Sequence, residues 1–435
     1  MSASSFLRRL LGGGRRGADG TVPNLLRLCD ALMAESGEYT STALAREALD
    51  AIQALDLLER EQFFDVLARD YSPSPEAVAQ SASAYHADPS PANLAQLFAT
   101  VEPPRQELFR RLNMAPGGTA ALVEMRKQLL KSLRSRPQWA AIDADLMHLL
   151  RSWFNRGFLR LERIDWRTPA IVLEKLIEYE AVHAIQGWRD LRRRLEADRR
   201  CFAFFHPQLP DEPIIFIEVA LTRSMSAHIQ PLLDIGAPVS SATCDCAMFY
   251  SITNCQEGLR GISFGNLLIK QVAEELKREF PHLRRFATLS PLQGFRRWVE
   301  QKRVQHPKEL EPLSRLDQPD WHLGEVSDAM QRMLTRLCAY YLLHAKQGDE
   351  PLDPVARFHL GNGAALERLN WMGDISETGM ARSAGLMVNY VYWLNEVERN
   401  HERYWREKAI TASPAVEKLA RECVLAAPAE KGAAA

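Results

Sequence analysis

Apolar residues recur at intervals of three and four along most of the chain from Val22 to about Arg199. This spacing places them on one face of successive α-helices. Proline and glycine interrupt the pattern at residues 72–75, 88–91, 103–104 and 116–118, and Ser90 stands where a helix start favours a hydroxyl. The pattern predicts a bundle of about seven to nine helices. We expect such a bundle to serve scaffolding or self-association, because it carries no evident chemistry.

After residue 200 the pattern changes to short apolar runs, which are typical of β-strands. Strands are predicted at 201–205, 214–221, 248–252, 285–289 and 386–393. Helices are predicted at 180–198, 267–280, 324–345 and 355–371. The order of these elements predicts an α+β protein, with an all-helical N-terminal bundle followed by a mixed-sheet domain. The expected boundaries are a flexible tail at 1–21, a helical domain at 22–190 and the sheet domain at 191–435.

A glycine-rich turn separates the predicted strand at 248–252 from the helix at 267–280. Gly258, Gly261 and Gly265, together with Ser263, leave backbone N–H groups unpaired just before that helix, where the helix dipole adds partial positive charge. Such a turn is suited to bind a phosphate or pyrophosphate. It has neither a Walker ending nor a clean G-x-G-x-x-G spacing, so a tight connection between strand and helix is the competing interpretation.

The charge balance excludes some classes of partner. The chain has 54 basic and 55 acidic residues and a net charge of −1, so nothing attracts it generally to nucleic acid or to a membrane surface. The chain has no run of about 18 apolar residues, so no transmembrane helix is predicted. The arginine-rich start, residues 2–17, matches either an organelle-targeting segment or a solvated tail. We expect residues 2–17 to be a solvated tail. We also expect a cytoplasmic protein of bacterial type, with organelle targeting as the alternative.

Seven cysteines are scattered along the chain, a pattern that suits a reducing compartment better than a disulfide framework. Cys244, Cys246 and Cys255 raise the alternative of a metal site. A C-x-C spacing without paired histidines is poor for zinc, so we expect buried cysteines and no metal.

A basic run occupies the end of the predicted helix at 180–198. It consists of Arg189, Arg192, Arg193, Arg194, Arg199 and Arg200. We expect a solvated helix face, with contact to an anionic ligand as the alternative. The interspersed acidic residues argue against a nucleic-acid patch.

Several separate blocks, in order from about Glu180 to Trp393, resemble malonyl-CoA decarboxylase. The blocks are Phe249–Ile252, the turn through Gly265, Phe280–Leu283, Leu289–Pro291, Gly294-Phe295, Ala356–Leu360, Asn370–Met372 and Leu386–Tyr390. The catalytic half of that family is similar to GNAT-type acyltransferases, in which a glycine-rich strand–helix turn holds the pyrophosphate of CoA. The resemblance implies a GNAT-like sheet domain and decarboxylation of malonyl-CoA to acetyl-CoA and CO2 without metal or organic cofactor. It also implies a homo-oligomer, dimer or tetramer, formed through the helical domain.

The same resemblance assigns the site residues. The catalytic serine and histidine of the family correspond to Ser290 and His359 in this sequence. A contributing tyrosine of the family corresponds to Tyr392, with Tyr390 as the second choice. Substrate contacts are expected from Tyr250, Gly258, Arg260, Gly261, Ser263, Phe264, Gly265, Asn266 and Asn362. Some relatives carry an acid where this chain has Ser263, which puts any role of that acid in doubt here. Asn370 and Asn389 are further candidates for supporting groups.

The chemistry of decarboxylation fits these residue types. Loss of CO2 leaves an enolate on the thioester, which hydrogen-bond donors stabilise, and a histidine suits protonation of the carbanion carbon. Taken alone, a serine before proline is usually a turn residue, and a single histidine on an amphipathic helix is usually a hydrogen-bonded, half-buried one. Two alternatives stay open: a GNAT-type acyltransferase with Glu218 or Glu257 as base, and a non-catalytic CoA-binding scaffold.

Overall fold

The computed structural model describes residues 21–234, 236–262, 268–318, 321–322 and 328–426. The chain divides into two compact units, Met1–Phe154 with Gln256–Ile262 and Asn155–Cys255 with Ser263–Ala435. Apart from its last residue, the expected tail at 1–21 lies outside the described residues.

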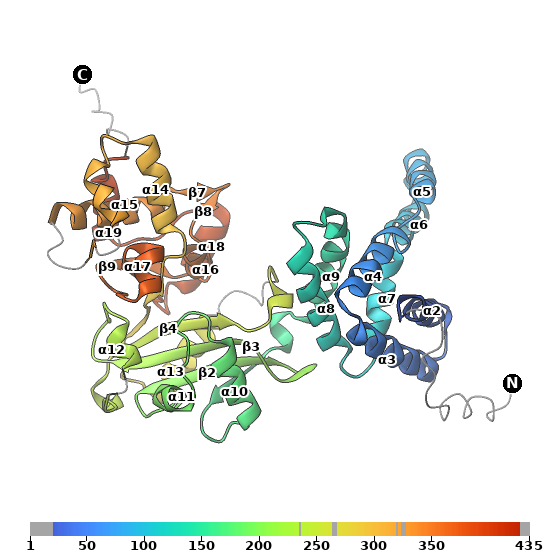
Figure 1. The fold of residues 1–435 in the computed structure, drawn as a ribbon, viewed down its shortest axis with the longest axis horizontal. Helices are drawn as coiled ribbons and strands as arrows, with labels where there is room; N and C mark the ends of the chain where they lie inside the picture. The colour runs from blue at the N-terminus through green and yellow to red at the C-terminus, as the bar shows by residue number, and fades with distance from the viewer. Residues whose placement is uncertain (1–20, 235, 263–267, 319–320, 323–327, 427–435) are drawn as a thin grey trace. The chain divides into compact units, whose positions relative to one another are not determined.

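The first unit contains eight described α-helices, coloured from blue to green in Figure 1. They are α2 (Thr21–Ala34), α3 (Glu38–Ala54), α4 (Leu57–Arg69), α5 (Pro75–Ala87), α6 (Pro91–Val101), α7 (Pro104–Asn113), α8 (Gly118–Ser132) and α9 (Ala140–Trp153). The apolar faces of these helices, apart from α5 and α6, which have no buried residue, meet in a core that includes Leu25, Leu49, Leu108 and Leu129. The Ser90 hydroxyl accepts the N–H of Asn93 at 3.4 Å and begins α6 as expected. The predicted helical bundle is confirmed for this part of the chain.

The segment Gln256–Ile262 belongs to the first unit because it packs on helix α8. The guanidinium of Arg126 donates to the carbonyl oxygens of Gly258 (2.7 Å) and Arg260 (2.9 Å). A Cβ atom at Gly258 would lie 2.0 Å from the carbonyl oxygen of Val123. Close packing against a helix backbone therefore explains the glycine at 258.

An eight-stranded mixed sheet forms the centre of the second unit, with the strand order β1-β2-β3-β4-β5-β10-β6 and with β9 paired to β10. The strands are β1 (Arg160–Ile164), β2 (Arg199–His206), β3 (Leu209–Thr222), β4 (Cys246–Asn254), β5 (Arg285–Thr288), β6 (Ser290–Pro291), β9 (Ala365–Asn370) and β10 (Met387–Val391). All of these described pairs are antiparallel except β4 and β5, which are parallel and are joined through α13 (Leu268–Glu279). This strand–helix–strand unit confirms the α+β layout.

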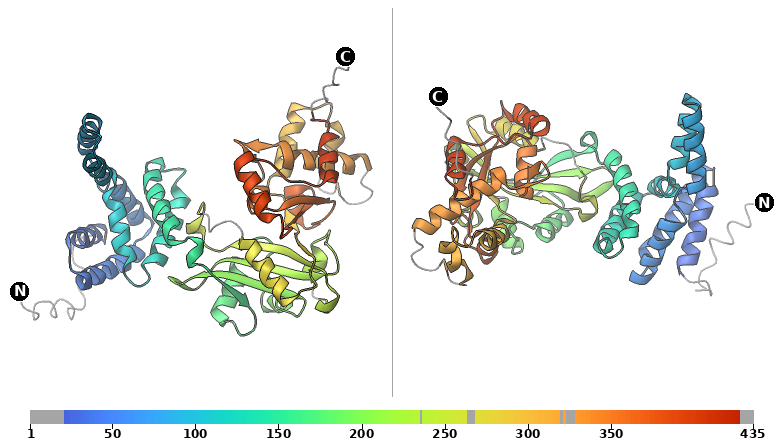
Figure 2. Two further views of the ribbon diagram at one scale, coloured as in Figure 1. Left: turned by 180° about the vertical axis from the view of Figure 1, so that it is seen from behind. Right: turned by 90° about the horizontal axis from the view of Figure 1, so that it is seen from above.

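Helices cover both faces of the sheet. Helices α10 (Ala170–Tyr179) and α11 (Trp188–Arg194) pack on one face, where Val172 and Leu191 join a core cluster with Phe205 and Phe216. Helix α13 lies across the opposite face, which is turned toward the viewer in the left view of Figure 2. Strands β2, β3 and β4 are consequently buried along most of their length.

The remaining elements lie around strands β9 and β10 and position the end of the sheet. They are α12 (Gln230–Leu233), α14 (Phe295–Gln305), α15 (Asp328–His344), the pair β7 (Lys346–Gln347) and β8 (Glu350–Pro351), α16 (Pro354–Gly361), α17 (Glu377–Ser383), α18 (Val397–Glu407) and α19 (Pro414–Arg421).

The first unit ends at Phe154, earlier than the boundary expected at residue 190. Strand β1 reads Arg-Leu-Glu-Arg-Ile, so it has too few apolar residues to give a strand signal, yet it pairs with β2 along its whole length. Helices α10 and α11 bury their apolar residues on the same sheet. Residues 155–190 therefore belong with the sheet and not with the helical bundle.

The expectation of a solvated basic face is wrong for most of the arginine run. The helix spans only Trp188–Arg194, and four of the six arginines are buried in ion pairs. The pairs are Arg193 with Asp198, Arg194 with Glu218, Arg199 with Asp198, and Arg200 with Glu279, each with a shortest distance of 2.7 Å. Only Arg189 and Arg192 of this run are exposed.

The helix expected at 355–371 is two elements, α16 and β9. Gly363, at φ +84°, lies between them, and a Cβ atom there would lie 2.1 Å from the carbonyl oxygen of Val397. His359 consequently lies in the last turn of α16 and not near the start of a long helix, and Asn370 lies on a strand. Apolar spacing alone did not reveal this break.

All seven cysteines are buried and free. Within the described ranges, no group of three or more histidine, cysteine or acidic side chains is arranged to hold a metal ion. In the same ranges, none of the helices combines the length and the apolar character needed to cross a bilayer.

Candidate active site

Ser290 lies at a break in the sheet. Strand β5 ends at Thr288, and β6 begins at Ser290, which pairs with Val388 of strand β10. The proline that follows cannot donate to a ladder, which favours a short strand here. Ser290 is buried, and its Oγ lies 3.0 Å from Nε2 of His359.

His359 is held by a short, well-capped helix. Asp353 is the N-cap of α16, and its Oδ1 accepts the N–H groups of Val355 (3.0 Å) and Ala356 (2.9 Å). Its Oδ2 accepts the N–H of Gln293 at 3.1 Å, in the loop that follows Ser290. One buried carboxylate therefore ties together the two segments that carry Ser290 and His359.

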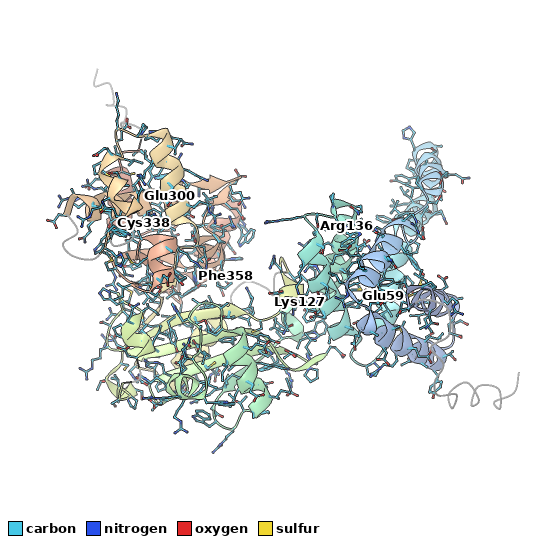
Figure 3. The ribbon with its side chains drawn as sticks, in the orientation of Figure 1. Glu59, Lys127, Arg136, Glu300, Cys338 and Phe358 are labelled. Atoms are coloured by element: carbon cyan, nitrogen blue, oxygen red, sulfur yellow. The ribbon has the colours of Figure 1, made fainter. Side chains whose placement is uncertain are left out.

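Tyr392 directly follows β10 and completes the group. Its hydroxyl lies 2.8 Å from Nδ1 of His359. The ring of Tyr390 stacks on the imidazole, with centroids 4.7 Å apart and planes 26° apart, and its hydroxyl has no hydrogen-bond partner among the described residues. Phe358, labelled in Figure 3, meets the imidazole edge-on at 5.2 Å. Aromatic rings thus fix the plane of His359 while hydroxyl groups occupy both of its nitrogens.

Burial sets the charge state of these groups. Removal from water lowers the pKa of His359 to about 3 and raises the pKa of Tyr392 well above its usual value of 10.0. Both groups are neutral at pH 7. The hydroxyl of Ser290, the imidazole and the phenol therefore form an uncharged hydrogen-bonded line that can hand on a proton.

Two asparagines, Asn389 and Asn370, form hydrogen bonds next to this line. Asn389 donates from Nδ2 to the carbonyl oxygen of Thr288 at 2.7 Å, and its Oδ1 accepts from Asn370 at 2.9 Å and from Arg368 at 3.0 Å. Asn362, in contrast, donates from Nδ2 to the carbonyl oxygen of Phe358 at 2.7 Å, a contact that holds the C-terminal end of α16.

Other predicted contacts lie elsewhere in the chain. Gly258, Arg260 and Gly261 belong to the segment packed on α8 in the first unit. Tyr250 is buried in a core cluster with Met248, and its hydroxyl has no hydrogen-bond partner among the described residues. Ser263, Phe264, Gly265 and Asn266 lie outside the described residues. The substrate-binding role of this set stays a prediction.

Glu218, considered above as a base, is committed to an ion pair. Its Oε2 accepts from Arg194 at 2.7 Å, on the sheet face covered by α11. The neighbouring residue Val219 pairs with Phe249, whose ring contacts Tyr392 at a centroid distance of 6.4 Å. Successive side chains point to opposite faces of a strand, so Glu218 points away from the group around His359. Glu257 is exposed in the first unit.

Two important residues were missed from the sequence, Thr288 and Asp353. The pair Asp353-Pro354 was recognisable, since aspartate before proline is a common helix start. No local signal distinguishes Thr288, because its importance depends on where the Ser290 hydroxyl points.

Comparison with known proteins shows extensive similarity. The family model for the malonyl-CoA decarboxylase C-terminal domain matches residues 157–431, and that for the N-terminal domain matches residues 71–154. Mitochondrial malonyl-CoA decarboxylase of Anser anser anser is 38% identical over 346 residues, 72% of this chain and 69% of that protein. The corresponding protein of Rattus norvegicus is 38% identical over 338 residues, 70% of this chain and 69% of that protein.

Solved structures agree with these matches. A crystal structure of malonyl-CoA decarboxylase from Rhodopseudomonas palustris has a TM-score of 0.89 and 47% identity, and covers 92% of this chain and 100% of that chain. The one from Agrobacterium vitis has a TM-score of 0.86 and 48% identity, and covers 91% of this chain and 99% of that chain.

Proposed function

Because the chain belongs to the malonyl-CoA decarboxylase family, we propose that it converts malonyl-CoA to acetyl-CoA and CO2, with Ser290, His359 and Tyr392 around the reacting atoms. The observation that carries the proposal is the hydrogen-bonded line of these three residues. His359 lies 3.0 Å from Ser290 and 2.8 Å from Tyr392 at its two ring nitrogens. Three separate parts of the chain meet there, which supports a role beyond packing.

The reaction needs an electron sink and one proton. The bond between the methylene carbon and the carboxylate carbon breaks, CO2 leaves, and the electron pair becomes the enolate of the thioester. The thioester is itself the sink, so the proposal requires no metal or organic cofactor. The enolate carbon then takes one proton and yields acetyl-CoA.

We assign the protonation of this carbon to His359. A neutral imidazole can release a proton from one nitrogen while it accepts another at the second nitrogen, where Tyr392 stands. The Ser290 oxygen, 3.0 Å from Nε2 of the same ring, is suited to orient His359. Because the imidazole and the Tyr392 phenol are buried and held in place, they can donate to the charge that develops without a large reorganisation.

Binding of the CoA diphosphate to the turn from Gly258 to Asn266 stays part of the proposal as a prediction. The contact of Gly258 with the α8 backbone gives that glycine a packing explanation of its own. The residues 263–266, on which the prediction also depends, lie outside the described residues.

The acyltransferase alternative is less well supported. It requires a carboxylate base near the thioester, and the side chain of Glu218 is engaged with Arg194 on the other face of the sheet. The scaffold alternative predicts CoA binding without turnover. It does not explain why Ser290, His359 and Tyr392 form a buried hydrogen-bonded line.

Incubation of the purified chain with malonyl-CoA, without added metal or cofactor, tests the function. We expect equimolar CO2 and acetyl-CoA. Ser290→Ala and His359→Ala should each lower kcat by about tenfold or more. The variants Ser135→Ala and His282→Ala remove the same groups at exposed positions, so they should leave kcat unchanged. Malonyl-CoA that binds but stays intact would refute the proposal.

We also propose that copies of the chain associate through the helical unit. No residue of α6 is buried within the chain, although Leu94, Phe98 and Val101 form an apolar stripe along it and Phe98 is 66% exposed. A stripe of this kind is typical of an interaction surface. Phe98→Glu should reduce the mass measured by sedimentation, whereas Gln96→Glu on the opposite side of α6 should not. An unchanged mass for Phe98→Glu would exclude this surface.

A further inference from the structure

Thr288 ends strand β5, two residues before Ser290, and is only 1% exposed. Its Oγ1 accepts the O–H of Ser290 at 2.8 Å and the backbone N–H of Tyr390 at 3.2 Å. Its carbonyl oxygen accepts from the side chain of Asn389 at 2.7 Å. At this point hydrogen bonds that involve side chains replace the backbone ladder between β5 and β10. The backbone N–H of Tyr390 consequently fixes the position of the Thr288 hydroxyl.

This contact determines where the Ser290 proton points. A serine hydroxyl has one proton, and the geometry of the contact makes Ser290 the donor to Thr288. That proton is then not available to Nε2 of His359, 3.0 Å away. The hydrogen bond between Ser290 and His359 therefore requires a proton on Nε2.

The other ring nitrogen follows from the same count. His359 is neutral because burial lowers its pKa to about 3, so the ring carries a single proton. With that proton on Nε2, Nδ1 has a lone pair and accepts the O–H of Tyr392 at 2.8 Å. Every hydroxyl and nitrogen between Thr288 and Tyr392 thus has a defined direction of donation.

We propose that Thr288 is a positioning residue for the decarboxylation: by holding the hydroxyl proton of Ser290, it selects the tautomer of His359 that carries its proton on Nε2. This inference rests on the proposed function, although the tautomer itself does not depend on turnover. Without the Thr288 acceptor, the Ser290 O–H turns to Nε2. The ring proton then moves to Nδ1, on the side of Tyr392 and away from Ser290.

Kinetics of substitutions at Thr288 give the first test. Thr288→Val removes the acceptor, and we expect kcat for malonyl-CoA to fall about tenfold, with KM within about twofold. Thr288→Ser keeps the hydroxyl and should recover most of the rate. Thr335→Val is the matched control, because the Thr335 hydroxyl donates only to the carbonyl oxygen of Gln331 in its own helix, at 2.8 Å. Equal loss of kcat in Thr288→Val and Thr288→Ser would overturn the proposal.

Nitrogen NMR of the full chain labelled with 15N-histidine gives the second test. The chain has 11 histidines, and the His359 signals are assigned by their loss in His359→Asn. We expect a protonated Nε2 and an unprotonated Nδ1 in the wild type, and a shift toward a protonated Nδ1 in Thr288→Val. Should the valine variant not fold, Thr288→Ala removes the same acceptor with a smaller side chain.

The two measurements separate the two proposals. A wild-type ring protonated on Nδ1, or a ring unchanged by loss of the Thr288 hydroxyl, would overturn the positioning role whatever the turnover. A ring that responds as expected in a chain that does not decarboxylate malonyl-CoA would support the positioning of the proton and refute the proposed function alone.

Discussion

Replacing Gly258 with alanine tests how the segment Gln256–Ile262 is held on α8. The new Cβ atom would lie 2.0 Å from the carbonyl oxygen and 2.8 Å from the carbonyl carbon of Val123. Both are backbone atoms of a helix and cannot turn aside. Overpacking of this kind typically costs about 1–3 kcal/mol, and the short distances favour the upper end of that range.

The segment can relieve the clash only by leaving α8. It would then lose the hydrogen bonds from Arg126 to the carbonyl oxygens of Gly258 (2.7 Å) and Arg260 (2.9 Å). Hydrogen bonds to charged groups contribute about 1.5–3 kcal/mol each, so detachment costs more than strained packing. We therefore expect Gly258→Ala to keep the segment attached and to lower the free energy of unfolding by about 3 kcal/mol.

Urea unfolding of the full chain, followed by circular dichroism, measures this loss. Gly261→Ala is the matched control, because a Cβ atom there meets only Met147 Sδ at an ordinary 3.7 Å, and its φ of +79° costs an alanine about 1–2 kcal/mol. Arg126→Met should destabilise Gly258→Ala as much as it destabilises the wild type. Equal losses for the two glycine variants, or no effect of Arg126→Met in the Gly258→Ala background, would refute the reasoning.

Three further predictions concern the second unit. Tyr392→Phe removes the hydroxyl at Nδ1 of His359 and should lower kcat about tenfold with little change in KM; an unchanged kcat in steady-state kinetics would exclude the phenol from proton transfer. Burial lowers the pKa of His359 to about 3 from 6.5, so stability present above pH 6.5 is lost as pH falls toward 3. In urea titrations, the free energy of unfolding of His359→Phe should therefore fall by about 2 kcal/mol less than that of the wild type between pH 6.5 and pH 4.5. An equal fall in the two proteins would contradict this. Arg194→Met leaves Glu218 buried without its guanidinium partner and should cost about 3–5 kcal/mol of unfolding free energy; adding Glu218→Gln should restore most of it, and failure to do so would show that the pairing is not the cause.

Local patterns in the sequence determined most of the elements. The strands at 201–205, 214–221, 248–252 and 285–289, and the helix at 267–280, all correspond to elements of the structure. Periodicity reports which face of a segment is buried, and this property is local. Ser290, His359 and Tyr392 were predicted as site residues only through resemblance to a family, since nothing in their immediate neighbours separates them from a turn residue, a helix residue and a core tyrosine.

Only the tertiary structure decided which of these residues contact one another. Ser290 and His359 are 69 positions apart, and their contact depends on the packing of α16 against the end of the sheet. The polar strand β1 forms because it pairs with β2. Four arginines that were expected to be solvated are buried in ion pairs. Gly258 and Thr288 gain their meaning from backbone and hydroxyl groups on other elements. Such contacts join distant positions, so neither periodicity nor spacing records them, and the direction of a single hydroxyl proton is known only when all of its neighbours are in place.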